Sequence, residues 1–475
     1  MRRTSIPRTG LLPFYLKLYD EILPDIKGGF DGFVKRIAAA MEARGISVQT
    51  APVCRVNDEF TSAIRQFEQE GMDCIVTLHL AYSPSMEAIE AFCHTKLPII
   101  ILDTTMDSSF GLAASPDKIM FNHGVHGVMD FASMLRRRSR PFEIVAGHDS
   151  DPRTIDRAAD RVRAAFAARS LRASRALRVG DAFAGMGDFA VEEAVLAGKL
   201  GIQVRQIGID ALDDAVCEIS DAEVAAEAAG DREQFVCELA SDVHERSVRV
   251  GLGLRRMLEC GHYNAISINF QIFDRKDRAA NTMPFLEISK AMARGIGYAG
   301  EGDVLTAALV GALARAFGPV TFTEIFCADW AGDSLFLSHM GEISPAVAAG
   351  IPRVFEKQFT FGGALNPAVL TCAVKPGPAV FVNLAPGPDD SFSLIVAPVE
   401  VLAEDASLDP AMRDVVRIWI RPRCKVAEFL ETYSLAGGTH HSALVLGDRT
   451  EAVAAFGRML NLNVVHIDRK KGELK

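Results

Sequence analysis

Short apolar segments rich in β-branched residues alternate with longer amphipathic segments in the first third of the chain. The apolar segments are GLLPFYLKLY, ISVQTAPV, CIVTLHL, PIIILDT and EIVAGH. Runs of this length separated by helical patterns are typical of parallel strands joined by crossover helices. The pattern predicts an N-terminal α/β domain over residues 1–175.

The same alternation begins again after a helical, arginine-rich stretch at residues 154–175. ALRVGDAF, IQVRQIG and AISINF are candidate strands, and helices are expected over residues 191–200 and 231–259. This pattern predicts a second, central α/β domain over residues 176–318.

From Pro319 onward, strand-like runs follow one another with Gly/Pro turns and few helices between them. These runs are TFTEIFCAD, SLFLSHM, AVLTCAV, PAVFVNL, FSLIVAPVEVL and VVRIWI, and PGPDD at 386–390 predicts a hairpin loop. The C-terminal domain, residues 319–475, is therefore expected to be mainly β. The fold class is α/β: two Rossmann-like parallel α/β domains followed by a mainly β domain, either a barrel or a sandwich.

The length, charge and cysteines narrow the class of protein. A chain of 475 residues exceeds one ordinary hydrophobic core, which stops growing near about 250 residues. The net charge of −10, spread in mixed sign, argues against nucleic acid or an anionic membrane as a partner and favours a small neutral or cationic ligand. Nine cysteines without a C-x-x-C pair form no disulfide framework, which favours a reducing cytoplasm.

The basic start of the chain imitates an export signal. Its apolar run is interrupted by Lys17 and Asp20 before it reaches a usable length, so no export signal is expected. No run of about 18 apolar residues occurs, so no membrane-spanning helix is expected either. These patterns predict a soluble, cytoplasmic protein.

Gly295, Gly297 and Gly300 spell G-x-G-x-x-G, the fingerprint of dinucleotide binding. That fingerprint follows a strand, whereas the preceding FLEISKAMAR is helical in pattern, so a glycine cluster that ends a helix is the better interpretation. Glu301 lies between Gly300 and Gly302, where the backbone is uncrowded and a ligand can approach closely. Asp303 is expected to cap the following helix, VLTAALVGALARAF.

Two more polar residues interrupt apolar segments. Glu324 lies inside VTFTEIF, where a carboxylate is costly to bury unless it is paired or binds a metal, although an outward strand position is the alternative. His339 ends SLFLSH, where an isolated histidine is more often a satisfied core residue than a ligand.

The pair His440 and His441 follows two glycines in LAGGTHHSALVLG. Neighbours in an extended segment point to opposite faces, so one histidine is expected to bind a metal and the other to contact a ligand or the structure. Two carboxylates and two imidazoles suit Mn²⁺, Co²⁺ or a similar ion, and no thiolate cluster favours structural zinc. The spacing matches no short metal motif, so the residues alone indicate only a plausible site.

Four motifs taken together resemble the L-arabinose isomerase family, in the same order. They are Y-A-G-E-G-D at 298–303, F-x-E at 322–324, S-H-M at 338–340 and G-G-T-H-H at 437–441. The weaker likeness of IVTLHLAYSPSMEAI and MFNHGVHG extends the resemblance to nearly the whole chain. It implies two α/β domains and a β-rich one, and a homo-oligomer, trimer or hexamer, with sites completed at subunit contacts.

The resemblance also implies an aldose–ketose isomerase that uses Mn²⁺, with Co²⁺ or Mg²⁺ as alternatives, on a small sugar. Glu301, Glu324, His339 and His441 resemble the metal ligands, and Glu301 and Glu324 the acid/base pair that moves a proton between C1 and C2 through a cis-enediol. The residues expected to contact the sugar are Leu18, Tyr19, Tyr82, His123, His126, Phe183, Phe270 and His440.

Two departures bear on the substrate. Leu16 stands where the family has a substrate-contacting Gln, and His123 stands where a Gln is usual. L-arabinose itself is therefore in question, and D-galactose, L-fucose, D-arabinose or a modified sugar are alternatives. A non-catalytic sugar-binding protein of the same fold is a further alternative. The presence of all four residues that resemble metal ligands argues against it.

Overall fold

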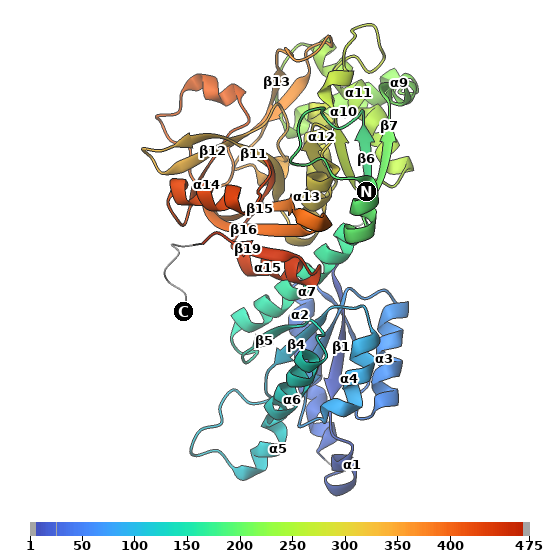
Figure 1. The fold of residues 1–475 in the computed structure, drawn as a ribbon, viewed down its shortest axis with the longest axis vertical. Coiled ribbons are helices and arrows are strands. Elements are labelled where there is room, and N and C mark those ends of the chain that lie inside the picture. Colours follow the sequence, from blue (N-terminus) through green and yellow to red (C-terminus); the bar gives the residue numbers. More distant parts are fainter. Residues whose placement is uncertain (1–5, 25, 469–475) are drawn as a thin grey trace. The chain divides into compact units, whose positions relative to one another are not determined.

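The chain folds into two compact units. The computed structural model describes residues 6–24 and 26–468, so the first five residues of the basic start lie outside it. Unit 1 comprises Met1–Arg169 and unit 2 comprises Ser170–Lys475 (Figure 1). Among the described residues, no helix is long and apolar enough to cross a membrane.

Unit 1 is built on a five-stranded parallel sheet in the order β2-β1-β3-β4-β5. The strands are β1 (Arg8–Phe14), β2 (Ser47–Thr50), β3 (Cys74–His79), β4 (Ile99–Asp103) and β5 (Glu143–Ala146). The helices between and after them include α2 (Asp31–Glu42), α3 (Asn57–Gln69), α4 (Ser85–His94), α6 (Gly124–Arg137) and α7 (Pro152–Arg172). All five predicted strands are confirmed. The central strands β3 and β4 are buried almost throughout, as parallel strands covered on both faces must be.

His79 ends β3 among aromatic rings in the core of unit 1. Its ring centroid lies 4.4 Å from that of Phe14 and 5.8 Å from that of Phe131. Nδ1 lies 2.9 Å from the Ser83 hydroxyl, and Nε2 is buried with no hydrogen-bond partner among the described residues. Burial lowers the pKa of His79 from 6.5 to about 3, because an imidazolium ion is poorly solvated in this core.

We expect His79 to make the protein less stable in mild acid. The unfolded chain protonates this histidine near pH 6.5, whereas the folded protein does so only near pH 3. The unfolded state therefore binds more protons between these values, and the free energy of unfolding falls by about 2 kcal/mol from pH 7 to pH 5 on account of His79. Urea denaturation of the wild type and of His79→Leu at both pH values measures this share. Equal losses in the two proteins would show that His79 is not the cause.

Unit 2 begins with a four-stranded parallel sheet in the order β10-β9-β6-β7. Its strands are β6 (Arg175–Val179), β7 (Gln203–Ile207), β9 (Ala265–Ile268) and β10 (Gly297–Gly300). Helix α13 (Val304–Phe317), which is buried along most of its length, packs against β9 and β10. The helix predicted at 191–200 is observed as α8 (Glu193–Val195), which continues into a π-helical turn at Leu196–Leu200.

Two local predictions in this region are wrong. The long helix expected over 231–259 is divided into α10 (Asp221–Gln234) and α11 (Ser241–Cys260) by the short strand β8 (Val236–Glu238). β8 pairs with β13 (Arg353–Glu356), more than a hundred positions later in the chain, so tertiary pairing overrides helical periodicity. The glycine cluster does not simply end a helix, because only Gly295 follows α12 (Phe285–Ala293), while Gly297 and Gly300 belong to β10.

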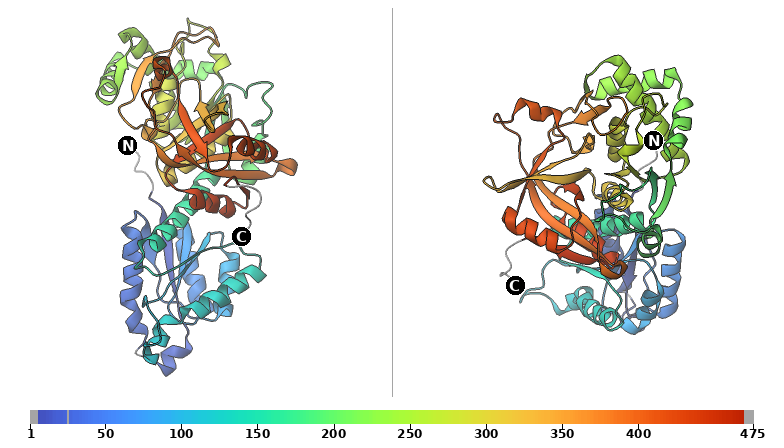
Figure 2. Two further views of the ribbon diagram at one scale, coloured as in Figure 1. Left: turned by 90° about the vertical axis from the view of Figure 1, so that its left-hand side faces the viewer. Right: turned by 45° about the horizontal axis from the view of Figure 1, so that its top comes forward.

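The rest of unit 2 contains a closed six-stranded antiparallel barrel in the order β15-β18-β11-β12-β17-β16, closed by pairing of β15 with β16 (Figure 2). The barrel strands are β11 (Val320–Asp329), β12 (Ser334–Ser338), β15 (Gly377–Pro386), β16 (Phe392–Val401), β17 (Ile418–Pro422) and β18 (His441–Leu446). The third predicted run, AVLTCAV, forms β14 (Ala368–Thr371) beside β13 rather than a barrel strand. The barrel and the hairpin loop at 386–390 are confirmed, whereas the boundaries at 175/176 and 318/319 stay predictions.

Candidate metal centre

Three neighbouring barrel strands bring Glu324, His339 and His441 to one place. β11 lies between β18 and β12, and Glu324 is paired with His441 on one side and with Ser338 on the other. Cross-strand partners project from the same face of a sheet, so Glu324 and His441 point in the same direction. His339 follows Ser338 directly after the end of β12.

Glu301 reaches the same place from the parallel sheet of unit 2, in the turn between β10 and α13. Its backbone has a φ of +56°, a left-handed conformation that is uncommon for a residue with a side chain and is typical of functional sites. Gly300 makes room for the centre, because a Cβ at that position would lie 2.9 Å from Cε1 of His339. The glycine before Glu301 thus has a steric reason, because a side chain there would collide with His339.

The side chains of Glu301, His339 and His441 form one buried cluster. Each offers a ligand atom, and the three atoms lie within 4.8 Å of one another. Oε2 of Glu301 lies 3.0 Å from Nε2 of His441 and 3.6 Å from Nε2 of His339. Glu324 lies at the margin of this group, with its Oε2 3.9 Å from Nε2 of His339. Its role as a fourth ligand stays a prediction.

A carboxylate holds the other ring nitrogen of each histidine. Nδ1 of His441 lies 3.0 Å from Oδ2 of Asp303, and Nδ1 of His339 lies 2.9 Å from Oε1 of Glu342. A carboxylate accepts a hydrogen bond from Nδ1–H, so each Nε2 is left as the nitrogen that faces Glu301. This carboxylate–histidine pairing is the usual support of a histidine that binds a metal ion.

The cluster fits a divalent cation by its charge as well. Four carboxylates (Glu301, Asp303, Glu324 and Glu342) surround two imidazoles in a buried site, which leaves an excess of negative charge. Oε2 of Glu301 and Nε2 of His441 are both buried with no hydrogen-bond partner among the described residues. A cation that accepts oxygen and nitrogen ligands would satisfy both atoms.

The pKa values of the cluster move in opposite directions. Burial raises the pKa of Glu301, but the adjacent imidazoles of His339 and His441 outweigh this effect and hold the pKa below its usual range. Burial also raises the pKa of Glu324, and there the histidines do not compensate. For His441, burial lowers the pKa, but Asp303 and Glu301 raise it to about 9.

Aromatic rings fix the orientation of His441. Phe189 stacks on its imidazole with the centroids 5.2 Å apart and an angle of 15° between the planes. Phe322 packs edge-on at 5.0 Å. The ring of the neighbouring His440 lies 4.2 Å from that of His441, and Oδ2 of Asp188 accepts hydrogen bonds from the backbone N–H of His440 at 2.9 Å and from its Nδ1–H at 2.6 Å. The two adjacent imidazoles thus lie side by side rather than on opposite faces as expected, and they differ in their polar partners: Asp303 for His441 and Asp188 for His440.

The residues expected to contact a sugar form two groups, one in each unit. In unit 1, the Tyr19 hydroxyl lies 3.1 Å from Nε2 of His123, the ring of His126 lies 6.2 Å from that of His123, and Leu18 is about half exposed. The backbone N–H of Tyr82 lies 3.5 Å from the same nitrogen. In unit 2, Phe183 and Phe270 pack with centroids 5.7 Å apart, and the backbone N–H of Phe183 donates to the Glu301 carbonyl at 2.8 Å. Their contact with a sugar stays a prediction.

Four residues of the centre escaped sequence reasoning. Asp303 caps α13 through Oδ1, which accepts from the Thr306 N–H at 2.9 Å, as predicted, but its second oxygen binds His441. The other three, Glu342, Asp188 and Phe189, were not singled out at all. Only Glu342 carried a usable signal, since it lies three positions after His339; Asp188 and Phe189 are brought to the centre by the fold.

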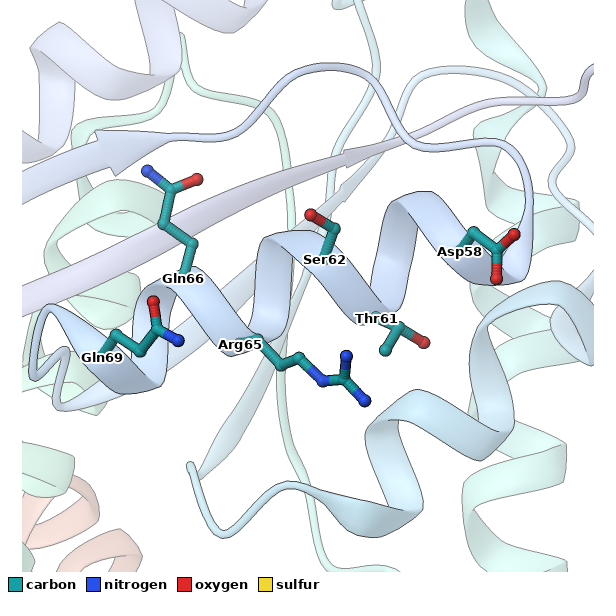
Figure 3. Close-up of a pocket in the computed structure, with 6 residues that line it drawn as sticks. All are labelled: Asp58, Thr61, Ser62, Arg65, Gln66 and Gln69. Carbon is teal, nitrogen blue, oxygen red and sulfur yellow. The ribbon is translucent and has the colours of Figure 1, made fainter.

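A hollow on the surface of unit 1 offers no comparable chemistry. It is lined by side chains of one helix, α3: Asp58, Thr61, Ser62, Arg65, Gln66 and Gln69 (Figure 3). The lining contains a single carboxylate and no histidine or cysteine, so it resembles an ordinary solvated helix face.

The fold and the centre define a class: an α/β protein with an antiparallel barrel and a buried carboxylate–histidine cluster. The chain matches the N-terminal, central and C-terminal domains of L-arabinose isomerase at residues 17–173, 176–316 and 320–463. It is 27% identical over 452 residues to the L-arabinose isomerase of Nocardioides sp., covering 91% of this chain and 88% of the relative. It is 28% identical over 446 residues to that of Herpetosiphon aurantiacus, covering 89% and 86%. The chain belongs to the L-arabinose isomerase family.

Proposed function

We propose that this protein is a metal-dependent sugar isomerase that interconverts an aldose and its ketose. The observation that carries the proposal is the convergence of Glu301 from the parallel sheet with His339 and His441 from the barrel, within 4.8 Å of one another. A carboxylate supports each histidine from behind. Membership of the family supports the choice of reaction.

Glu301, Glu324, His339 and His441 would hold the ion, with Mn²⁺ as the first choice and Co²⁺ or Mg²⁺ as alternatives. The mixed oxygen and nitrogen ligands and the lack of thiolates suit these ions. When bound, the ion would polarise the carbonyl and hydroxyl oxygens at C1 and C2 of the open-chain sugar.

Glu301 and Glu324 would carry the proton between C1 and C2 through a cis-enediol. Both carboxylates lie within 4 Å of Nε2 of His339, so they flank the same space. Their pKa values shift in opposite directions, which suits a pair in which one group is ionised and the other protonated. Phe183, whose N–H binds the Glu301 carbonyl, and Phe270 would form an apolar wall that orients the sugar and excludes water.

The remaining sugar contacts would come from Leu18, Tyr19, Tyr82, His123 and His126 of unit 1 and from His440. The family resemblance supports a cytoplasmic homo-oligomer, trimer or hexamer, in which a second copy completes each site. We infer the boundaries of three domains, 1–175, 176–318 and 319–475, on the same ground.

A sugar other than L-arabinose is the second candidate substrate, and the surroundings of His123 favour it. Nδ1 of His123 lies 2.9 Å from the Ile119 carbonyl, which can only accept, so Nδ1 carries the proton and Nε2 is an acceptor. The Tyr19 hydroxyl can donate to that Nε2. A glutamine amide would instead offer both a donor and an acceptor. This difference, with Leu16 in place of another Gln, supports D-galactose, L-fucose, D-arabinose or a modified sugar as alternatives.

Metal-dependent ketose formation tests the proposal. The protein is purified with a chelator, Mn²⁺ is added back, and ketose is measured across aldopentoses, aldohexoses and deoxy sugars. We expect product from at least one sugar only when the ion is present. Product that is independent of the ion would contradict the metal-dependent mechanism. Bound metal and bound sugar without any product would instead favour a non-catalytic sugar-binding protein.

A further inference from the structure

A group of buried polar side chains lies inside the barrel behind His441. Side chains alternate along β18, so His441 faces the metal centre while Ser442 faces the barrel interior. Near Ser442 lie Asn383 of β15, Thr439, and Tyr433 of α14 (Val426–Leu435), all almost fully buried. Polar groups in an apolar core cost free energy unless they form hydrogen bonds, so the partners of this group show what it supports.

Both the nitrogen and the oxygen of the Asn383 carboxamide form hydrogen bonds with the segment that precedes and includes His441. Its Nδ2 donates to Oγ1 of Thr439 at 2.6 Å and to the carbonyl of His441 at 2.7 Å. Its Oδ1 accepts from the N–H of Thr439 at 3.3 Å. A carbonyl can only accept and a backbone N–H can only donate, so both ends of the amide are assigned by their partners.

These hydrogen bonds begin where the backbone ladder stops. The pairing of β15 with β18 ends at Val382 and Ala443. Beyond that point, backbone hydrogen bonds between the two strands are replaced by those of the Asn383 side chain, which fix residues 439–441 next to β15. Tyr433 holds the same segment from α14, because its hydroxyl donates to the Thr439 carbonyl at 2.5 Å and lies 3.1 Å from Oγ of Ser442.

His441 is thus held from two sides. Inside the barrel, Asn383 and Tyr433 fix the backbone from which its side chain departs. Outside the barrel, Asp303 and Phe189 fix the rotation of its ring. We propose that Asn383, supported by Tyr433, is a positioning residue that holds Nε2 of His441 where it can share a divalent ion with Glu301 and His339. The inference rests on the proposed function in that the centre must bind a metal ion.

Metal binding without substrate tests this inference. The metal-free, full-length protein is titrated calorimetrically with Mn²⁺, and the visible spectrum of the Co²⁺ complex reports the ligand geometry. The variants are Asn383→Ala and Tyr433→Phe. Thr371→Val is the matched control, because Thr371 is also a buried hydroxyl that donates to a carbonyl, that of Arg413 at 3.0 Å, but it lies on β14 outside the barrel.

We expect the Kd for Mn²⁺ to rise about 10- to 100-fold in Asn383→Ala, the range found when an outer partner of a metal ligand is removed. Tyr433→Phe should show a smaller rise, both variants should alter the Co²⁺ spectrum, and Thr371→Val should change neither readout. A purely structural role would lower stability in all three variants without this difference.

An unchanged Kd and spectrum in Asn383→Ala would overturn the inference and leave the proposed function intact. If Asn383→Ala does not fold, Tyr433→Phe decides, and an unchanged Kd in that variant overturns the inference. Failure of the wild type to bind Mn²⁺ or Co²⁺ would overturn the proposed function itself. This result is distinguishable from an unchanged Kd in either variant, which overturns only the inference.

Discussion

Replacing Glu301 with Gln is expected to abolish turnover while the protein stays folded. The amide keeps the size of the side chain and the left-handed turn, but it removes the negative charge that lies 3.0 Å from His441 and 3.6 Å from His339. Loss of an acid/base group alone costs about 10²- to 10⁴-fold in rate, and loss of a metal ligand adds to it. We therefore expect kcat to fall by at least about 10³-fold in the ketose assay with saturating Mn²⁺.

Glu404→Gln is the matched control for this variant. Glu404 is also a carboxylate of unit 2 with a basic partner, since it lies 2.8 Å from Arg417, and none of its polar contacts among the described residues is with the centre. Circular dichroism and thermal denaturation should show both variants to be folded. Turnover at the wild-type rate in Glu301→Gln would remove Glu301 from the reaction.

His441→Ala is expected to raise the metal requirement steeply. The variant removes an imidazole that is completely buried and whose Nε2 has no other partner among the described residues. Since removal of an outer partner already costs 10- to 100-fold in metal affinity, loss of the ligand should raise the Kd for Mn²⁺ by at least about 100-fold. Titration of the metal-free protein measures this value, and excess Mn²⁺ should restore part of the activity.

The adjacent His440 provides the control for His441. Its ring lies 4.2 Å from that of His441, but it is partly exposed and hydrogen-bonded to Asp188, so His440→Ala should bind Mn²⁺ nearly as the wild type does. Equal Kd values for the two variants would mean that the choice of His441 over its neighbour is wrong.

The parts of the fold that follow from local pattern could be predicted from the sequence. Strands such as β3, β4 and β9 appear as apolar runs because their own residues must be buried, whereas β10, whose sequence is GYAG, has no such run and was not predicted. The break between α10 and α11 could not be predicted, because β8 exists only through its pairing with β13. Similarly, AVLTCAV reads as a strand, but the sequence does not say that it pairs with β13 instead of joining the barrel.

The metal centre was likewise predictable from the sequence only in part. Glu301 and Glu324 attract attention because a charge among glycines or inside an apolar run needs a reason. That Glu324 is the cross-strand partner of His441 depends on the register of β11 and β18, which no local pattern reveals. Glu342 and Asp188 were overlooked because their hydrogen bonds with His339 and His440 are recognised only once the chain is folded.

The origin of the ligands in two different sheets has a consequence for folding. Asp303 and His441 meet across 138 positions of sequence, so the complete set of ligands exists only after the barrel has packed against the parallel sheet of unit 2. A bound ion would then act as a late cross-link that closes a long loop and slows its reopening, rather than as a nucleus around which the chain collapses. Each tenfold rise in free ion above the Kd would add about 1.4 kcal/mol to the stability of that packed state, so supply of the ion would govern the lifetime of the protein as well as its activity.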